Sequence, residues 1–203
     1  MKTKTLKKLF SVLLSVIIIS CFILYIYIQR KNKVNEKNLL QVANSIINEA
    51  VVTGIEENCI EEETFSVDKI SSNGDILGKI LIPKINVEAP IKEGTTAETL
   101  KEAVGHFSNT KYWNGNIGLA SHNRGTYAHY FENINQLNNG DEIIYQTKLG
   151  TRVYAVESVT EISEEDFSVL NNTNKNYITL ITCIKNKQNM RLCVKAVERS
   201  IYE

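Results

Sequence analysis

Two cysteines and an arginine near the end of the chain have the residue types of a nucleophilic site. The stretch TLITCIKNKQNMRLCV, residues 179–194, places Cys183 and Cys193 ten residues apart with Arg191 between them. A thiolate is a strong nucleophile, and a neighbouring guanidinium favours the thiolate and can donate hydrogen bonds to a developing oxyanion. Three interpretations follow: a disulfide, part of a metal site, or a nucleophile with a second thiol nearby.

Metal binding is disfavoured by the number of ligands. Structural zinc sites use four Cys or His ligands at close paired spacing, whereas this stretch offers two thiols and a repulsive charge. An exported protein can form disulfides, but a chain of 203 residues can bury a core without them. We therefore interpret Cys183 as a candidate nucleophile. Cys193 lies in an otherwise apolar run, which suits a buried structural cysteine equally well.

Side-chain alternation predicts how Cys183 and Arg191 meet. Residues 177–183 alternate as a strand that ends at Cys183, the polar IKNKQNM segment follows, and the alternation resumes at Met190. Pairing of the two strands as a hairpin sets Arg191 opposite Cys183 and Cys193 opposite Ile181. The two thiols are then diagonal, about 7–8 Å apart, beyond the roughly 4.4–6.8 Å between Cα atoms that a disulfide requires. We expect Cys183 to be a free thiol.

The chain has three histidines that could exchange a proton with a substrate. His122, in LASHNRG, follows a predicted strand and is the favoured general acid/base. His106, in AVGHF, is the competing assignment. His129, in YAHYF, is assigned to packing within an aromatic cluster of Tyr127, Tyr130 and Phe131.

From Ile76 onward the sequence shows short strands separated by turn signals. One helix candidate, TTAETLKEAVGHF, begins with a threonine cap and ends near Gly105. Pro83 indicates a strand edge or a bulge. The pattern predicts a single antiparallel-rich β-barrel or sandwich with minor helices. The strand runs are LGKILIPKINVEAPI, NIGLASHN, GDEIIYQT, RVYAVESVTEI, NYITLITC and RLCVKAVERSI.

The N-terminal region has the composition of a membrane anchor. Residues 9–28 contain no charge, and twenty helical residues at about 1.5 Å each reach across a bilayer core of roughly 30 Å. The bulky residues that end this run do not suit signal-peptide cleavage. Four basic residues precede the run and three follow it, so the positive-inside rule favours a cytoplasmic N-terminus by a narrow margin.

We expect four regions along the chain. They are a cytoplasmic tail (1–8), a transmembrane anchor (9–28), an extracellular stalk (29–75) with a short amphipathic helix followed by an acidic, turn-rich segment, and a catalytic domain (76–203).

The zero net charge of the chain hides an asymmetry. Seven of its 23 basic residues precede Val34, which leaves 16 basic against 23 acidic residues and a net charge of −7 for the exported part. An acidic ectodomain is a poor nucleic-acid binder, so we expect no nucleic-acid partner.

Together these motifs resemble the sortases, the cysteine transpeptidases that attach proteins to the Gram-positive cell wall. The resemblance rests on TLITC, an arginine eight residues later, the upstream LASHN, the first strand run, the VGH segment and the N-terminal anchor, and it covers residues 76–201. It is greatest to class D, ahead of classes A and B. Two features depart from the family: the usual AGH or TGH triplet is ASH here, and Cys193 is an additional thiol.

The resemblance implies a closed eight-stranded barrel of mainly β structure with short helices, preceded by the transmembrane helix. It also implies Cys183 as nucleophile, His122 as general acid/base and Arg191 as oxyanion stabiliser. The thiolate would attack a peptide bond in an LPXTG-like sorting signal, and the thioester would pass to an amine of lipid II or of a peptidoglycan stem peptide. The enzyme would act at the outer face of the cell membrane.

The acidic run EISEED, residues 161–166, could supply oxygen ligands to calcium, as acidic residues near this position do in some sortases. Calcium sites need about six or more converging oxygens, and the run provides only some of them. We therefore favour a solvated acidic loop and expect no required cofactor or metal. By the same resemblance, residues 161–176 border the substrate groove.

Two other functions stay open on the sequence alone. The ectodomain could be a non-catalytic, membrane-anchored β-barrel binding module in which Cys183 is buried or bridged. It could also be a cell-wall hydrolase that uses the same cysteine and histidine without an amine acceptor.

Overall fold

The structure is a computed structural model that describes residues 2–54, 75–125 and 128–199. Cys59, Tyr127 and most of the acidic segment of the expected stalk lie outside the described residues. Contacts divide the chain into two compact units, with the boundary between Asn35 and Glu36.

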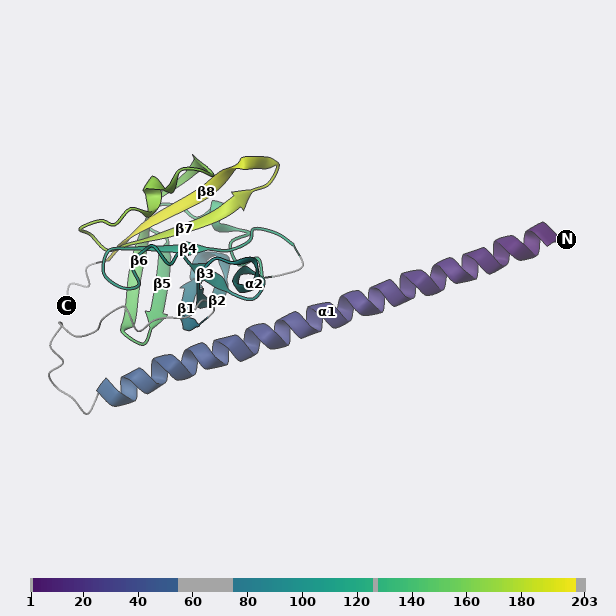
Figure 1. The fold of residues 1–203 in the computed structure, drawn as a ribbon, viewed down its shortest axis with the longest axis horizontal. Helices are drawn as coiled ribbons and strands as arrows, with labels where there is room; N and C mark the ends of the chain where they lie inside the picture. Colours follow the sequence, from purple (N-terminus) through teal and green to yellow (C-terminus); the bar gives the residue numbers. More distant parts are fainter. Residues whose placement is uncertain (1, 55–74, 126–127, 200–203) are drawn as a thin grey trace. The chain divides into compact units, whose positions relative to one another are not determined.

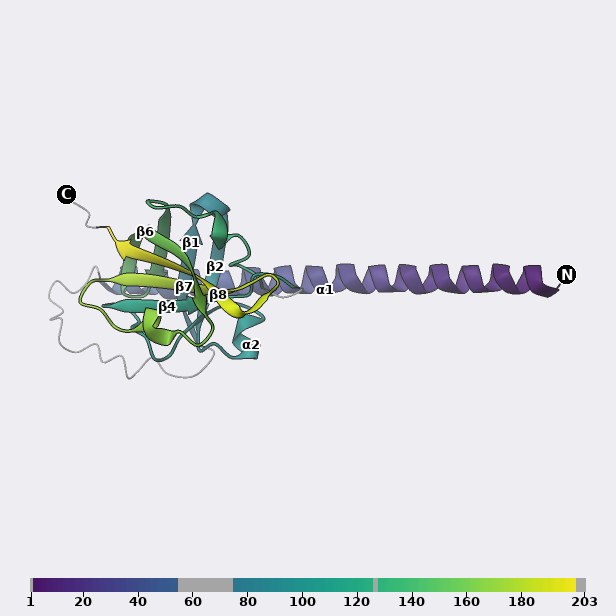
Figure 2. The ribbon, with the colours of Figure 1, turned by 90° about the horizontal axis from the view of Figure 1, so that it is seen from above.

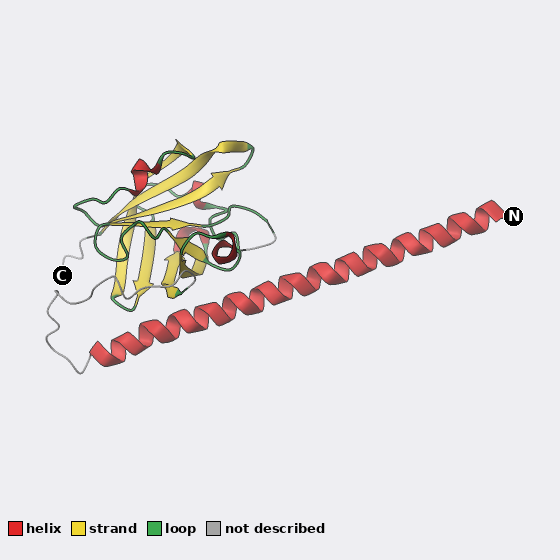
Figure 3. Ribbon diagram, viewed as in Figure 1, coloured by secondary structure: helices red, strands yellow, loops and turns green. Residues whose placement is uncertain are grey.

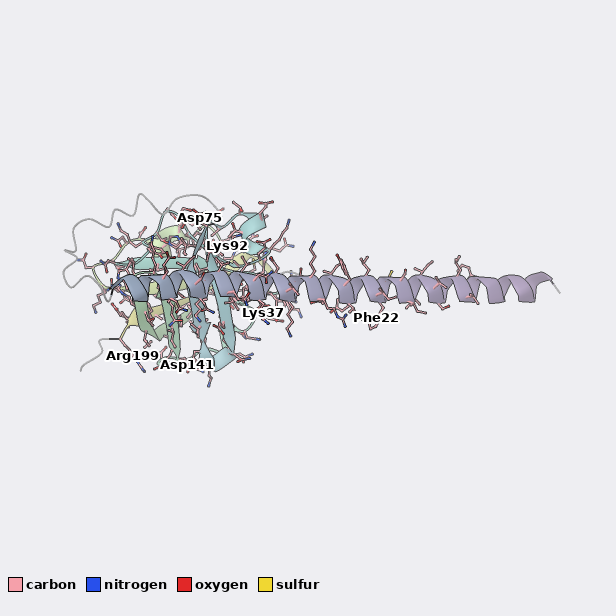
Figure 4. The ribbon with its side chains drawn as sticks, turned by 90° about the horizontal axis from the view of Figure 1, so that it is seen from below. Phe22, Lys37, Asp75, Lys92, Asp141 and Arg199 are labelled. Atoms are coloured by element: carbon pink, nitrogen blue, oxygen red, sulfur yellow. The ribbon has the colours of Figure 1, made fainter. Side chains whose placement is uncertain are left out.

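The N-terminal region forms one continuous helix, α1, Lys2–Gly54. The sequence predicted a membrane helix and a short amphipathic helix in the stalk, and in the structure both belong to this one helix. No glycine or proline interrupts the sequence between Leu9 and Thr53, so nothing breaks the backbone hydrogen bonding. Large apolar side chains of the first unit point outward from the helix, as Phe22 does in Figure 4. By length and composition the helix is able to cross a membrane.

Residues 76–198 form a closed barrel of eight strands with short helical turns between them (Figures 1 and 3). This confirms the predicted barrel and excludes an open sandwich. The barrel order is β1-β2-β3-β4-β7-β8-β6-β5. The strands are β1 Ile76–Ile82, β2 Val87–Glu93, β3 Val104–His106, β4 Asn116–Ala120, β5 Glu142–Thr147, β6 Gly150–Ser163, β7 Tyr177–Ile184 and β8 Lys187–Glu198.

Two of the strand pairs are parallel, β2 with β3 and β4 with β7, and the other pairs are antiparallel. Because β4 and β7 run in the same direction, their C-terminal ends meet at one rim of the barrel. Figure 2 shows β7 between β4 and β8. Residues that follow β4 are therefore neighbours of residues that end β7.

Alternating apolar side chains fill the barrel. On β7, Ile178 and Leu180 are fully buried, whereas the alternate residues Ile181 and Cys183 belong to the outer face. Burial of such side chains is the main source of stability for a fold of this kind. The largest fully buried side chains are Tyr145, Tyr154, Phe131, Ile80, Ile82, Ile91, Ile117, Leu119, Ile134, Ile143, Ile178 and Leu180.

Three local predictions need correction or refinement. The first strand run is two strands, because Pro83 begins the 3-10 turn η2, Pro83–Ile85, between β1 and β2. Asn86 then takes a left-handed conformation with φ 53° and donates its N–H to the carbonyl of Pro83 at 3.1 Å. The predicted helix shrinks to α2, Ala97–Leu100, capped by Thr96 as expected.

The VGH part of that predicted helix is strand β3 instead. Glycine is required at its centre, because a Cβ on Gly105 would lie 2.6 Å from the carbonyl oxygen of Gly94. This close approach lets β3 pair in parallel with β2, so long-range pairing overrides the local helical pattern.

Candidate active site

The β7/β8 hairpin places Cys183 directly opposite Arg191, and Ile181 opposite Cys193. The register predicted from side-chain alternation is thus confirmed. The next pair after Cys183 and Arg191 is Ile184 with Lys187, so β8 holds three additional residues, Gln188–Met190, at this point. This bulge lies where the strand passes the thiol.

Cys183 is exposed near the end of β7, whereas Cys193 is buried at 2% exposure. Both are free thiols, in agreement with the predicted diagonal geometry. Burial raises the pKa of Cys193 to about 11, so this thiol stays protonated at neutral pH. Of the two cysteines, only Cys183 is accessible to a substrate.

The guanidinium of Arg191 is held by three acceptors. Nη1 donates to the carbonyl of Gln188 at 2.8 Å and to that of Met190 at 2.9 Å, both within the bulge. Nη2 donates to Oε2 of Glu164 at 2.7 Å. The bulge therefore supplies two carbonyl oxygens that fix the arginine opposite the cysteine.

His122 lies two residues after β4 and is half-buried. Because Ala120 pairs with Ile181 in the parallel β4/β7 ladder, His122 and Cys183 each follow the last pair by two residues at the same rim. The peptide carbonyl of His122 accepts the N–H of Phe131 at 3.2 Å, which anchors the backbone. Within the described residues, its imidazole forms no hydrogen bond with another side chain.

Hydrogen bonds join the segment after β4 to the end of β7. The hydroxyl of Thr182 donates to the carbonyl of Ser121 at 2.7 Å, and the Ser121 N–H donates to the carbonyl of Ile181 at 3.4 Å. The amide of Asn123 donates to the carbonyl of Cys183. The backbone on both sides of His122 is thus attached to the backbone that carries the thiol.

His106, the competing histidine, is buried at 3% exposure beside Glu93, which is its partner in the β2/β3 ladder. Its Nδ1 lies 2.8 Å from Oε2 of Glu93, and its Nε2 lies 3.1 Å from the carbonyl oxygen of Lys111. Nε2 also faces the hydroxyl of Thr110, whose proton goes to the carbonyl of Phe107.

Both ring nitrogens of His106 therefore have hydrogen-bond partners within the protein. Burial alone would raise the pKa of Glu93, but hydrogen bonds from His106 and Ser108 and the charge of His106 outweigh burial and lower it. This histidine has no ring nitrogen left for a substrate.

The ring of His129 is exposed and lies 3.4 Å from the carboxylate of Glu132. Because Tyr127 lies outside the described residues, the aromatic cluster predicted around His129 stays a prediction.

Three of the four carboxylates of the acidic run bind groups of the protein itself. Glu161 receives Lys187 Nζ on both carboxylate oxygens, at 2.6 and 2.8 Å, and Glu164 binds Arg191. Asp166 accepts hydrogen bonds from the backbone N–H and the hydroxyl of Ser168. Among the residues that the structure describes, no group of three or more His, Cys, Asp or Glu side chains is arranged to hold a metal ion.

Three contacts around the site were not predicted from the sequence: Thr182 with Ser121, Asn123 with Cys183, and Glu164 with Arg191. Thr182 directly precedes Cys183, and Asn123 directly follows His122. Their places next to the candidate residues are a signal in the sequence that could have identified them. Glu164 is 27 residues from Arg191, and only the strand pairing brings the two together.

Comparison with known proteins identifies the family. The model of the sortase domain matches residues 80–199, which is more than half of the chain. Sortase A of Bacillus anthracis is 33% identical over 122 residues, covering 60% of this chain and 58% of that protein. Sortase D of Bacillus subtilis is 34% identical over 113 residues, covering 54% and 55%. The chain spans a little more than half the length of these relatives.

Solved structures agree. A sortase D5 transpeptidase of Clostridium perfringens has a TM-score of 0.65 and 32% identity, covering 82% of this chain and 99% of that one. Sortase C of Clostridium perfringens with the C-terminal cell wall sorting motif has a TM-score of 0.60 and 25% identity, covering 81% and 89%. The fold is that of a closed barrel with a cysteine at one rim, and the chain belongs to the sortase family.

Proposed function

We propose that this chain is a membrane-anchored cysteine transpeptidase. Cys183 is the nucleophile, His122 the general acid/base and Arg191 the stabiliser of the oxyanion. The proposal is carried by one observation: the accessible thiol of Cys183 is paired with Arg191 at the barrel rim where His122 follows the neighbouring parallel strand.

The reaction proceeds in two halves. The Cys183 thiolate attacks the carbonyl carbon of a peptide bond, and Arg191 donates hydrogen bonds to the oxyanion that forms. The carbon–nitrogen bond then breaks, and His122 gives a proton to the leaving amine. In the second half an amine attacks the thioester, His122 accepts its proton, and the thiolate leaves.

The substrate is an LPXTG-like sorting signal of a secreted protein, and the acceptor is an amine of lipid II or of a peptidoglycan stem peptide. Support comes from membership of the family and from the similarity to the sortase C structure that contains a cell wall sorting motif. The scheme includes no metal, and the ion pairs of Glu161 with Lys187 and of Glu164 with Arg191 support this part of the proposal.

The regions of the chain follow from this proposal. Residues 1–8 form a cytoplasmic tail, residues 9–28 cross the membrane, residues 29–75 are a stalk, and residues 76–203 form the extracellular catalytic domain. The exposed apolar side chains of α1 support the membrane assignment, since they would contact lipid.

The test is to incubate the detergent-solubilised chain with LPXTG-containing peptides, with and without a stem-peptide amine. A transpeptidase yields a peptide joined to the amine, and the yield rises with amine concentration. Release of the acid alone at every amine concentration identifies a hydrolase. Peptide binding without cleavage identifies a binding module, and either result contradicts the proposal.

A further inference from the structure

Glu164 contacts the proposed active site but does not belong to the β7/β8 hairpin, which carries Cys183 and Arg191. Ser163, the last residue of β6, pairs with Met190 of the bulge, and Glu164 follows it. The backbone N–H of Glu164 donates to the carbonyl of Asn189 at 2.9 Å, and its carboxylate accepts from Arg191 at 2.7 Å. One residue thus contacts both the bulge and the arginine that the bulge holds.

The number of N–H donors on the guanidinium indicates how the contact with Glu164 affects the orientation of Arg191. Arg191 has five N–H donors in a rigid plane. Three of them are used within the described residues, by the carbonyls of Gln188 and Met190 and by the carboxylate of Glu164. The Nε–H and one Nη2 hydrogen remain for a substrate. Fixing three donors of a planar group fixes the orientation of the other two.

We propose that Glu164 is a positioning residue that orients Arg191, so that its two remaining donors are presented to the oxyanion formed at Cys183. This inference rests on the proposed function. It assigns part of the acidic run to holding the enzyme's own arginine, where the sequence offered only calcium ligands or a solvated loop.

A purely stabilising role does not fit this contact. The side chains of Arg191 and Glu164 are 26% and 38% exposed, and partly exposed ion pairs contribute little to stability. The neighbouring carboxylates are engaged elsewhere, Glu161 with Lys187 and Asp166 with Ser168. Loss of the Glu164 carboxylate therefore removes the carboxylate of the run that binds Arg191.

Glu165 supplies a matched control. It is adjacent in sequence, exposed and of the same charge, and its carboxylate forms no hydrogen bond or ion pair with another described residue. Glu165→Gln therefore changes the net charge as Glu164→Gln does, without touching Arg191.

The test measures acylation of the full-length chain in detergent by a sorting-signal peptide. We expect Glu164→Gln to lower kcat about tenfold with little change in KM, because one charge-assisted hydrogen bond orients the group that binds the transition state. Glu164→Asp, which keeps the charge, should recover part of the rate, and Glu165→Gln should match the wild type. In an Arg191→Lys background, Glu164→Gln should add less than about a twofold loss, because residues acting as a unit are non-additive.

A second measurement does not depend on activity. The chain has only five arginines, so the side-chain N–H signals of Arg191 can be assigned by NMR with the Arg191→Lys variant. Glu164→Gln should shift these signals and speed their exchange with solvent, whereas Glu165→Gln should not.

Three results would overturn the inference: unchanged Arg191 signals in Glu164→Gln, a variant as fast as or faster than the wild type, or a full independent loss in the Arg191→Lys background. A wild-type chain that forms no acyl-enzyme would reject the proposed function instead, while the NMR comparison would still decide the contact.

Discussion

Cys183 pairs with Arg191 across the β7/β8 hairpin at the point where three additional residues bulge out of β8. Two carbonyls of that bulge, from Gln188 and Met190, bind the guanidinium. A regular two-stranded hairpin would supply no such acceptors at this position. The register of the hairpin therefore brings Arg191 opposite Cys183, and the bulge in the same hairpin orients the guanidinium.

Arg191→Lys keeps the positive charge but loses the planar set of donors. A lysine ammonium cannot bind the bulge carbonyls and Glu164 while also presenting two donors to an oxyanion. We expect the acylation rate to fall on the order of a hundredfold, as for removal of an oxyanion donor. Rapid-quench measurement of acyl-enzyme formation checks this, and a lysine variant with nearly full rate would show that charge alone is sufficient.

His122 and His106 should respond differently to substitution with alanine. His122→Ala should reduce turnover as severely as Cys183→Ala while leaving the unfolding temperature close to that of the wild type. His106→Ala removes a buried partner of Glu93 and should mainly lower stability, by about 3 kcal/mol. Turnover and thermal unfolding of both variants decide the assignment, and the reverse order would make His106 the general acid.

The Glu93–His106 pair predicts a loss of stability in acid. Because folding lowers the pKa of Glu93 below its ordinary value of 4.5, this carboxylate contributes stability above that value. The contribution is lost as the pH falls through the folded pKa. Urea unfolding of a fragment lacking residues 1–33, measured from pH 7 to pH 3, should show this loss, and Glu93→Gln should reduce the pH dependence.

Exposed Glu98→Gln is the control for this series, because its carboxylate lies at the surface of α2. Equal pH dependence in the wild type and in Glu93→Gln would mean that the buried pair does not govern acid stability.

We expect Cys193 to take no part in catalysis. Its pKa of about 11 and its burial keep the thiol protonated and protected, whereas Cys183 is exposed. Alkylation of the fragment lacking residues 1–33 at pH 7 should modify Cys183 and spare Cys193. The Cys193→Ser variant should retain most of the wild-type rate. Intact mass before and after reductant counts the thiols. A complete Cys183–Cys193 disulfide in active protein would rule out Cys183 as the nucleophile.

The part of the site that the sequence predicted is the part encoded by local alternation. On β7 and β8 the alternation of side chains decides which residues share a face, and the register favoured from it pairs Cys183 with Arg191. The position of His122 after a strand was also readable, because the strand run ends there. Both inferences need only the two-residue period of a strand.

The remaining features depend on pairings between distant segments. The VGH segment reads locally as the end of a helix, yet parallel pairing with β2 makes it a strand and buries His106 against Glu93. Glu164 meets Arg191 only because β6 pairs with β8. Neither contact produces a periodic pattern in the sequence. The sequence alone therefore did not predict that Glu93 is the partner of His106 or that Arg191 is the partner of Glu164.

The central claim is that Cys183 forms a thioester with a sorting-signal peptide, and trapping that intermediate tests it most directly. The wild-type chain, mixed with an LPXTG-containing peptide and quenched in acid, should gain the mass of the acyl fragment, and peptide mapping should place the added mass on Cys183. Cys183→Ala should gain none, while Cys193→Ser should gain as much as the wild type. Turnover of the peptide by Cys183→Ala at the wild-type rate, or an adduct on any other residue, would contradict the account.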